Sequence, residues 1–322
     1  WANIVIAFFT AIGSVLIYYY LRLEGIIWVI LYASCVSLFV TVFFTRNYSF
    51  NINFSSFKNI YQESSPVVKL GFVLSINLIF GQICFFIIRS YLNGDGNSTN
   101  ILGFYEVNTV ILVNYLGLIF NAMSYDFYPK LTAIHQDNNK VKELVNSQME
   151  IAVLLVTPAI VFLYIFGPFL IQLLYTEEFL PTFVILKIAL FSVILKAITT
   201  PLAYLILAKG DKKQYFKQEL LGDFLNVILT IGLYNYFGLM GIGIAYIINY
   251  VIYGIYVYSV VKAKYNFKYY KENIRMIGVN LGIGIASILL VYFTEGFWTY
   301  ILLSIVFLFS LIYSFLQLNK RV

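Results

Sequence analysis

Residues 181–208 read PTFVILKIALFSVILKAITTPLAYLILA, an apolar run that contains two lysines and no acidic residue. A bilayer whose hydrocarbon core is about 30 Å thick needs about 20 residues of α-helix to cross it. Backbone N–H and C=O groups in lipid must also find their partners within the segment, as a helix allows. The stretch is therefore predicted to be a transmembrane helix.

Nine further apolar stretches of similar length follow one another along the 322 residues. The composition agrees, because 61% of the residues are hydrophobic and only 11% are charged, far from the average of a soluble domain. The sequence thus predicts an all-α polytopic membrane protein. The ten predicted helices cover residues 2–21, 26–45, 68–91, 103–125, 147–168, 181–208, 218–236, 239–261, 275–294 and 297–318.

The loops between these helices differ in charge from one side to the other. Of the 21 Lys and Arg residues, only Arg22 lies on one side, and Arg89, Lys187 and Lys196 lie inside helices. Because Lys and Arg accumulate in short cytoplasmic loops, both ends of the chain are predicted to be cytoplasmic. The cations on the predicted cytoplasmic side are Arg46, Lys58, Lys69, Lys130, Lys140, Lys142, Lys209, Lys212, Lys213, Lys217, Lys262, Lys264, Lys268, Lys271, Arg275, Lys320 and Arg321.

Several function classes lack the residues they require. The net charge of +6 is spread over five loops rather than one face, so no nucleic-acid partner is predicted. Cys35 and Cys84 lie in apolar helices without metal-ligand spacing, and His135 is the only histidine, so neither a metal site nor a catalytic constellation is predicted. A membrane-embedded glycosyl or acyl transferase is disfavoured because no loop is large enough to form its catalytic domain.

Two amphipathic segments indicate how the chain is organised. Aromatic residues recur every three or four positions over residues 50–61, which is typical of a helix in the membrane interface. We interpret 46–67 as a cytoplasmic linker, preceded by two helices of an incomplete lobe (1–45). A six-helix lobe (68–261) and a C-terminal helix pair (262–322) follow. A second segment, 137–149, opens with a capping Asp and is expected to lie along the cytoplasmic surface.

Five short motifs occur in an order that resembles one transporter family. They are LGFYEV at 102–107, FYPKL at 127–131, the mid-helix Thr157-Pro158-Ala159, LLYTEEF at 173–179, and FGLMGIGIA at 237–245 with Tyr250. Their order and spacing resemble the Wzx-type oligosaccharide-lipid flippases of the multidrug, oligosaccharidyl-lipid and polysaccharide exporter superfamily. The chain departs from that pattern at Thr176, where the family usually has Gly, and at Glu106, where it has a small or hydroxyl residue.

The resemblance implies a two-lobed carrier of fourteen helices, of which these ten align with the fifth to the last, so the chain is expected to lack about four N-terminal helices. It further implies alternating-access translocation of a polyprenyl-pyrophosphate-linked oligosaccharide across a bacterial or archaeal cytoplasmic membrane, for capsule, O-antigen or exopolysaccharide assembly. Membrane lipid and the pathway's polymerase and glycosyltransferases would be its partners. The alternative within the superfamily is a multidrug exporter coupled to H⁺ or Na⁺, with no other cofactor.

Such a carrier needs a polar, preferably cationic cavity, so ionisable residues within helices are the first candidates for it. Lys196 lies about 15 residues from either end of its helix, near the predicted midplane. Ser192, Thr199 and Thr200 share its face, whereas Lys187 is half a turn out of phase. A cavity-lining role for Lys196 stands beside a structural ion pair and snorkelling to the interface.

Other candidates lie on three further helices. Gln82 and Arg89 share a face, and Arg89 is interpreted either as an interfacial anchor or as a cation for phosphate at the outer exit. Asp223 shares a face with Glu219, Asn226 and Thr230, for which a helix-dipole role is weighed against ion coupling. Pro158 interrupts the backbone bonding of its helix and is a candidate hinge.

Glycines occur at close spacing on two helices. Gly278 and Gly282 form a GxxxG pair, and Gly238, Gly241 and Gly243 lie together on another helix. Because small residues let helices approach closely in lipid, both sets are predicted to be packing contacts.

Overall fold

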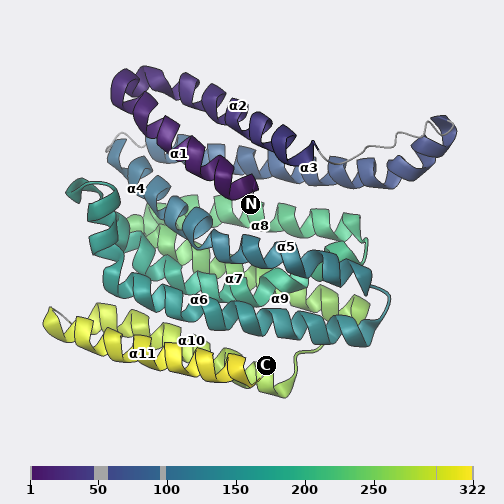
Figure 1. Ribbon diagram of the computed structural model, residues 1–322. Helices are drawn as coiled ribbons and strands as arrows, with labels where there is room; N and C mark the ends of the chain where they lie inside the picture. The colour runs from purple at the N-terminus through teal and green to yellow at the C-terminus, as the bar shows by residue number, and fades with distance from the viewer. Residues whose placement is uncertain (1, 47–56, 95–98, 295, 321–322) are drawn as a thin grey trace. The chain divides into compact units, whose positions relative to one another are not determined.

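The computed structural model describes residues 2–46, 57–94, 99–294 and 296–320, and all its regular structure there is helical (Figure 1). Each of the ten predicted spans coincides with helix. Among these residues, nine helical stretches are long and apolar enough to cross a membrane, the first of which, Ala2–Thr45, holds two helices. The helices are α1 (Ala2–Leu21), α2 (Gly25–Thr45), α3 (Phe57–Gly94), α4 (Thr99–Thr109), α5 (Gly117–Ala133), α6 (Asn138–Leu174), α7 (Thr182–Ala208), α8 (Lys212–Phe237), α9 (Leu239–Tyr265), α10 (Lys271–Phe293) and α11 (Phe297–Asn319).

The chain divides into two compact units, residues 1–65 and 66–322. In the first, α1 and α2 form a hairpin joined by a single 3-10 turn, Arg22–Glu24. Tyr32 lies across the hairpin, donates a hydrogen bond of 3.0 Å to the carbonyl of Phe9, and packs where any side chain on Gly13 would stand. Of the predicted interfacial helix, residues 50–56 lie outside the described part, and 57–61 form the first turns of α3.

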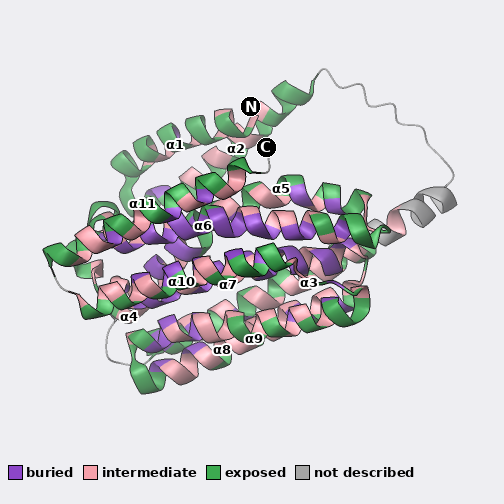
Figure 2. Cartoon of the chain, turned by 90° about the horizontal axis from the view of Figure 1, so that it is seen from below, coloured by how far each residue is buried: buried purple, intermediate pink, exposed green. Residues whose placement is uncertain are grey.

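The second unit is built around α6 and α7, which pack against each other and carry most of its fully buried side chains (Figure 2). On one side, α10 and α11 pack against α6. The α8–α9 hairpin packs on the other side, with α9 against α7. The C-terminal pair α10–α11 therefore packs directly on the lobe that precedes it.

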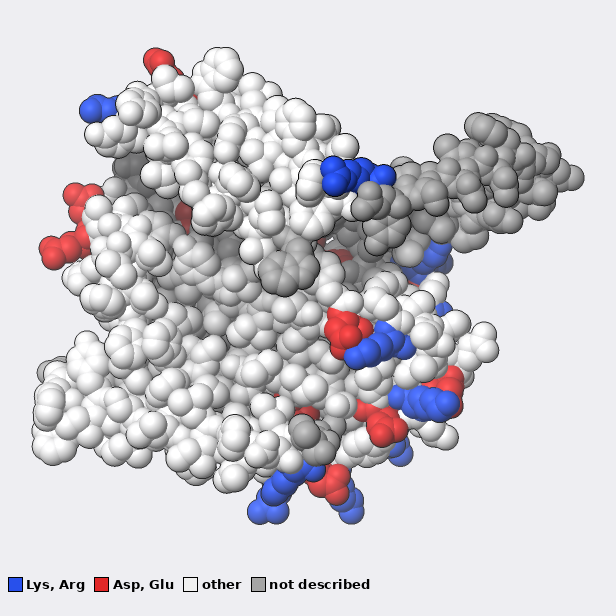
Figure 3. All heavy atoms as spheres, viewed as in Figure 1, with Lys and Arg blue, Asp and Glu red and all other residues white. Residues whose placement is uncertain are grey.

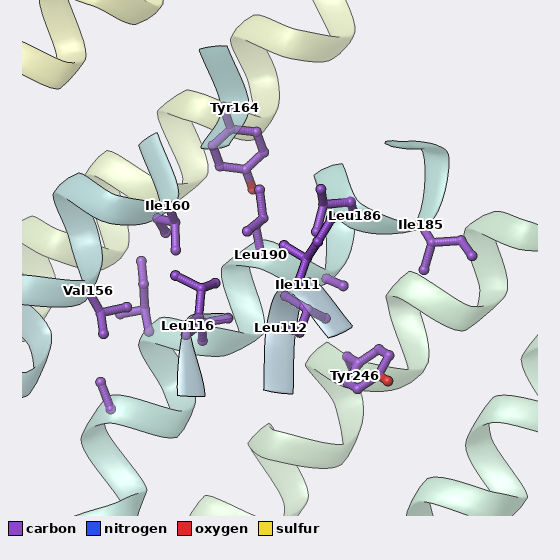
Figure 4. Close-up of a cluster of buried hydrophobic side chains, with 14 of the residues drawn as sticks. Ile111, Leu112, Leu116, Val156, Ile160, Tyr164, Ile185, Leu186, Leu190 and Tyr246 are labelled. Atoms are coloured by element: carbon purple, nitrogen blue, oxygen red, sulfur yellow. The ribbon is translucent and has the colours of Figure 1, made fainter. Parts of the chain in front are cut away.

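A π-helical segment, η2 (Val110–Tyr115), interrupts the span formed by α4 and α5. The N–H of Leu116 bonds the carbonyl of Ile111 at 3.0 Å, the wide i to i+5 bond of a π turn. Side chains of η2 enter the core between α6 and α7, where Ile111 and Leu112 meet residues such as Leu186 (Figure 4). No pattern in the sequence predicted this irregularity.

The predicted surface segment 137–149 is not a separate element. Asp137 caps a helix as expected, accepting bonds from the N–H groups of residues 139 and 140 at 3.0 and 3.2 Å, but α6 then continues without a break to Leu174. Val141 and Val145 are buried against residues of α7 and α9. The apolar residues of the segment that was expected along the cytoplasmic surface are therefore covered by protein.

The glycine pairs differ in what they contact. A Cβ on Gly241 would stand 2.0 Å from the carbonyl oxygen of Leu233, and one on Gly243 would stand 2.8 Å from that of Ile185. Gly278 and Gly282, by contrast, have nothing within 4 Å of such an atom. The packing prediction is thus confirmed for Gly241 and Gly243. It is wrong for Gly238, where a Cβ would also meet nothing within 4 Å, and for the GxxxG pair, because that face of α10 points away from its neighbours.

Buried amides join α6 to the start of α10. Asn146, fully buried, accepts a bond from the backbone N–H of Tyr270 at 3.1 Å and donates to the carbonyl of Lys142 at 2.8 Å. Asn273 donates to the backbone carbonyl of Asn146 at 2.9 Å. Buried polar groups are costly unless they are bonded, so this network fixes where α10 begins.

Replacing Asn146 by Ala is expected to lower the free energy of unfolding by about 1–3 kcal/mol, because the N–H of Tyr270 then has no acceptor. Thermal unfolding midpoints in one detergent measure this. Gln136→Ala, an exposed loop change, serves as the control and should shift stability by less than about 0.5 kcal/mol. Equal midpoints for the two variants would contradict the assignment.

Candidate functional site

A cavity of about 330 Å³ opens within the second unit between α7, α8 and α9. Its lining comes from five elements, with Phe85 of α3 and Val113 of η2 completing the walls. Four predicted site residues meet here, namely Lys196, Thr199, Thr200 and Asp223. The volume lies at the lower end of the range of about 300–1,000 Å³ that is usual for ligand sites.

The two lysines of α7 point to different neighbours, as their phase predicted. The ammonium of Lys196 lies 4.8 Å from the ring centroid of Phe120, and that of Lys187 lies 4.0 Å from the ring centroid of Tyr292 on α10. Within the described residues, Lys196 makes no ion pair with a carboxylate. Its charge is therefore available to a ligand in the cavity, whereas Lys187 lies outside the lining.

The threonines of the Lys196 face turn their hydroxyl hydrogens to the backbone. Thr200 donates to the carbonyl of Lys196 at 2.8 Å, and Thr199 donates to that of Leu195 at 3.0 Å. Ser192 is buried away from the cavity and donates to the carbonyl of Ala189 at 2.6 Å. Of the three hydroxyl residues on the predicted polar face, Thr199 and Thr200 thus line the cavity and Ser192 does not.

Two carboxylates share the cavity with the lysine. Glu219 accepts a bond of 3.0 Å from the hydroxyl of Tyr253, whereas Asp223 makes no hydrogen bond or ion pair to any described residue. A Cβ on Gly81 would stand 3.2 Å from Asp223 Oδ2, so this glycine leaves room for the carboxylate beside α3. The cavity is therefore not the cationic one expected from the substrate's charge.

The residue at which α8 begins argues against the helix-dipole role that was considered for Glu219. Asp211 caps this helix by accepting the N–H of Gln214 at 3.1 Å and the ammonium of Lys264 at 2.6 Å. Burial raises the pKa of Asp211, but these bonds outweigh it and hold the pKa below the usual value. Because α8 begins at Lys212 rather than 218, Glu219 lies two turns inside, beyond the first turn where the dipole acts.

Arg89 and Gln82 lie outside the cavity. Arg89 forms a two-point ion pair with Glu106, with Nε–Oε1 and Nη2–Oε2 distances of 2.5 and 3.0 Å, and Gln82 is exposed on α3. A guanidinium whose fork already holds a carboxylate favours the anchor interpretation of Arg89. The sequence analysis did not predict Glu106 as the partner of Arg89. The signal was present, because Glu106 is acidic where the family has a small or hydroxyl residue.

A second, apolar pocket of about 510 Å³ lies between η2, α6 and α11. Pro158 lines it together with Phe162, Leu186 and Phe307. The helix α6 runs continuously through Pro158, and the adjacent Thr157 donates to the carbonyl of Val153 at 2.9 Å. The hinge role of Pro158 stays a prediction.

On the face shown in Figure 3, most charged atoms of the second unit lie toward the ends of its helices, with a wide band of few charges between them. On the face shown, its Lys and Arg atoms lie toward the end where α5 finishes and α6 begins. This is the distribution of a multi-pass membrane protein.

The sequence model of the family described as "Polysaccharide biosynthesis protein" matches residues 2–184, more than half of the chain. The chain belongs to this polysaccharide biosynthesis protein family. The comparison of this chain with curated proteins found no match in sequence.

Among solved structures, this polysaccharide biosynthesis protein resembles "Lipid II flippase MurJ, inward closed conformation", with a TM-score of 0.64 and 14% sequence identity. The match covers 97% of this chain and 66% of the MurJ chain, so this protein spans slightly less than two thirds of the length of MurJ. At this identity the likeness is one of fold.

Proposed function

We propose that this protein is a flippase that moves polyprenyl-pyrophosphate-linked oligosaccharide across the cytoplasmic membrane by alternating access, for capsule, O-antigen or exopolysaccharide assembly. The family match supports a place in polysaccharide biosynthesis, and the structural neighbour is by its title a lipid II flippase. With both ends cytoplasmic, as the loop cations favour, the substrate's saccharide would leave on the opposite side.

The cavity around Lys196 is the observation that carries this proposal. Lys196 has no ion pair among the described residues, and an ammonium within a transmembrane helix costs free energy unless it serves a pathway or a partner. Lys196 lies beside Thr199 and Thr200, and we infer that it donates hydrogen bonds to oxygen atoms of the bound saccharide. The apolar pocket lined by Pro158 and Phe162 offers surroundings in which a prenyl tail remains in a hydrocarbon environment.

A cation-coupled multidrug exporter is the second candidate, because Glu219 and Asp223 are carboxylates of the kind that bind H⁺ or Na⁺ in transporters. Depletion of the protein in cells distinguishes the two functions. For a flippase, surface polysaccharide falls, its lipid-linked precursor accumulates inside, and drug sensitivity is unchanged. Normal surface polysaccharide with raised drug accumulation would instead establish the exporter.

A further inference from the structure

The cavity on α7, α8 and α9 combines three features that the proposed transport role does not itself require. It holds two carboxylates but one ammonium, it is walled by aromatic rings, and it contains a buried amide oxygen that has no partner among the described residues. Each of these features restricts which part of a lipid-linked saccharide fits there. Together they define a ligand chemistry.

With both carboxylates ionised, the charges of the cavity disfavour the pyrophosphate. When Lys196, Glu219 and Asp223 are all ionised, the cavity carries an excess of one negative charge. Asp223 lacks any ion pair or hydrogen bond to a described residue, and both of the bonds that Glu219 accepts end on Oε1, at 3.0 Å from Tyr253 and 3.5 Å from Gln218. A multiply charged anion beside these carboxylates would be repelled, whereas a cationic group would be attracted.

The aromatic walls fit sugar rings. Tyr204, Tyr215, Tyr250 and Tyr253 line the cavity, and the rings of Tyr250 and Tyr253 stand edge to face with centroids 6.5 Å apart. Tyrosine presents an apolar face and a polar tip, which suits a ring with C–H groups on its faces and hydroxyls at its edge. The same ring faces attract ammonium groups.

An unpartnered amide oxygen provides an independent sign of a ligand. Asn249 lines the cavity, and its Oδ1 is buried without a hydrogen-bond partner among the described residues. Native proteins bond nearly all buried polar groups, so this atom is expected to bond a polar ligand or the water it displaces.

We propose that this cavity binds the saccharide part of the substrate and selects a sugar that carries a protonated amino group, with Glu219 and Asp223 accepting from the ammonium. This proposal rests on the proposed flippase function. A bound metal ion is the less suitable occupant, because no group of three or more His, Cys, Asp and Glu in the described residues could hold one. The space allows about one or two sugar rings, and the pyrophosphate lies elsewhere.

Saccharide binding to the purified full-length protein in detergent, followed by saturation-transfer NMR, tests this selection without any translocation. The probes are three soluble disaccharides, namely the glucosamine dimer, its neutral N-acetylated form and a uronic acid dimer. The expected order of affinity is amine, then neutral, then acid. Each of Asp223→Asn and Glu219→Gln should weaken the amine probe about tenfold and leave the neutral probe nearly unchanged.

The control variant is Glu143→Gln, an exposed carboxylate of α6 outside the cavity, which should keep the wild-type order. Tighter binding of the acid probe, no binding of any probe, or an amine preference that survives both cavity variants would overturn the proposal. If one variant fails to fold, the other and the wild-type order still decide. Amine binding without lipid-linked transport would instead contradict only the proposed function.

Discussion

Replacing Lys196 by Gln is expected to lower polysaccharide export about ten- to hundredfold while the amount of protein in the membrane stays unchanged. The side chain lines the cavity and forms no ion pair with a carboxylate among the described residues, so its removal breaks no ion pair. Hydrogen bonds to a charged group contribute about 1.5–3 kcal/mol, and each 1.4 kcal/mol is about tenfold in affinity or rate. Surface polysaccharide and immunoblotted membrane protein are the two readouts.

Lys187→Gln is the matched control, since the same substitution on the same helix removes an ammonium that contacts the ring of Tyr292 rather than the cavity. A cation–π contact of this kind contributes about 0.5–2 kcal/mol, so the effect on export should be mild. Equal export by the two variants would show that Lys196 does not contact the substrate. Loss of the Lys196 variant from the membrane would mean that the lysine is structural.

Replacing Gly241 by Ala is expected to prevent the α8–α9 hairpin from closing. The new Cβ would stand 2.0 Å from the carbonyl oxygen of Leu233, 2.3 Å from its carbon and 2.8 Å from the backbone nitrogen of Tyr234. Because these are backbone atoms, no side-chain rotation relieves the overlap. We expect destabilisation of about 3 kcal/mol or more, at the upper end of overpacking effects.

The yield of monodisperse protein after detergent extraction measures this effect, together with its thermal unfolding midpoint. Gly278→Ala is the control, because a Cβ there meets nothing within 4 Å. Ala is favoured over Gly within helices by about 1 kcal/mol, so this variant should be as stable as the wild type or more so. A Gly241 variant that matches the control in yield and midpoint would contradict the packing of α8 against α9.

Features set by length and periodicity were predictable. The ten spans follow from runs of apolar residues that exceed the thickness of the bilayer, and the different directions of Lys187 and Lys196 follow from the helical period. Those two inferences depend on one helix at a time, so they needed no knowledge of the neighbours.

Features that depend on contacts between helices were not predictable to the same degree. The spacing showed that Glu219 and Asp223 share a face of one helix. Only the structure shows that Asp211 caps this helix, so that Glu219 lies inside it rather than in its first turn, and that Glu219 lines the cavity. The GxxxG pattern predicted that Gly278 and Gly282 of α10 pack against a neighbouring helix. The glycine of α10 that packs against α7 is instead Gly284. The π turn at 110–115 arises without a signal in the residue types.

The most direct measurement of the central claim is translocation by the purified full-length protein in liposomes that contain a polyprenyl-pyrophosphate-linked oligosaccharide. A glycosidase added outside reports which saccharides have reached the outer leaflet. Our account predicts protein-dependent exposure of saccharide beyond the fraction cleaved in protein-free vesicles, and its loss in the Lys196→Gln variant. Cleavage equal to that of protein-free vesicles, in liposomes where the protein carries drug or proton flux, would contradict it.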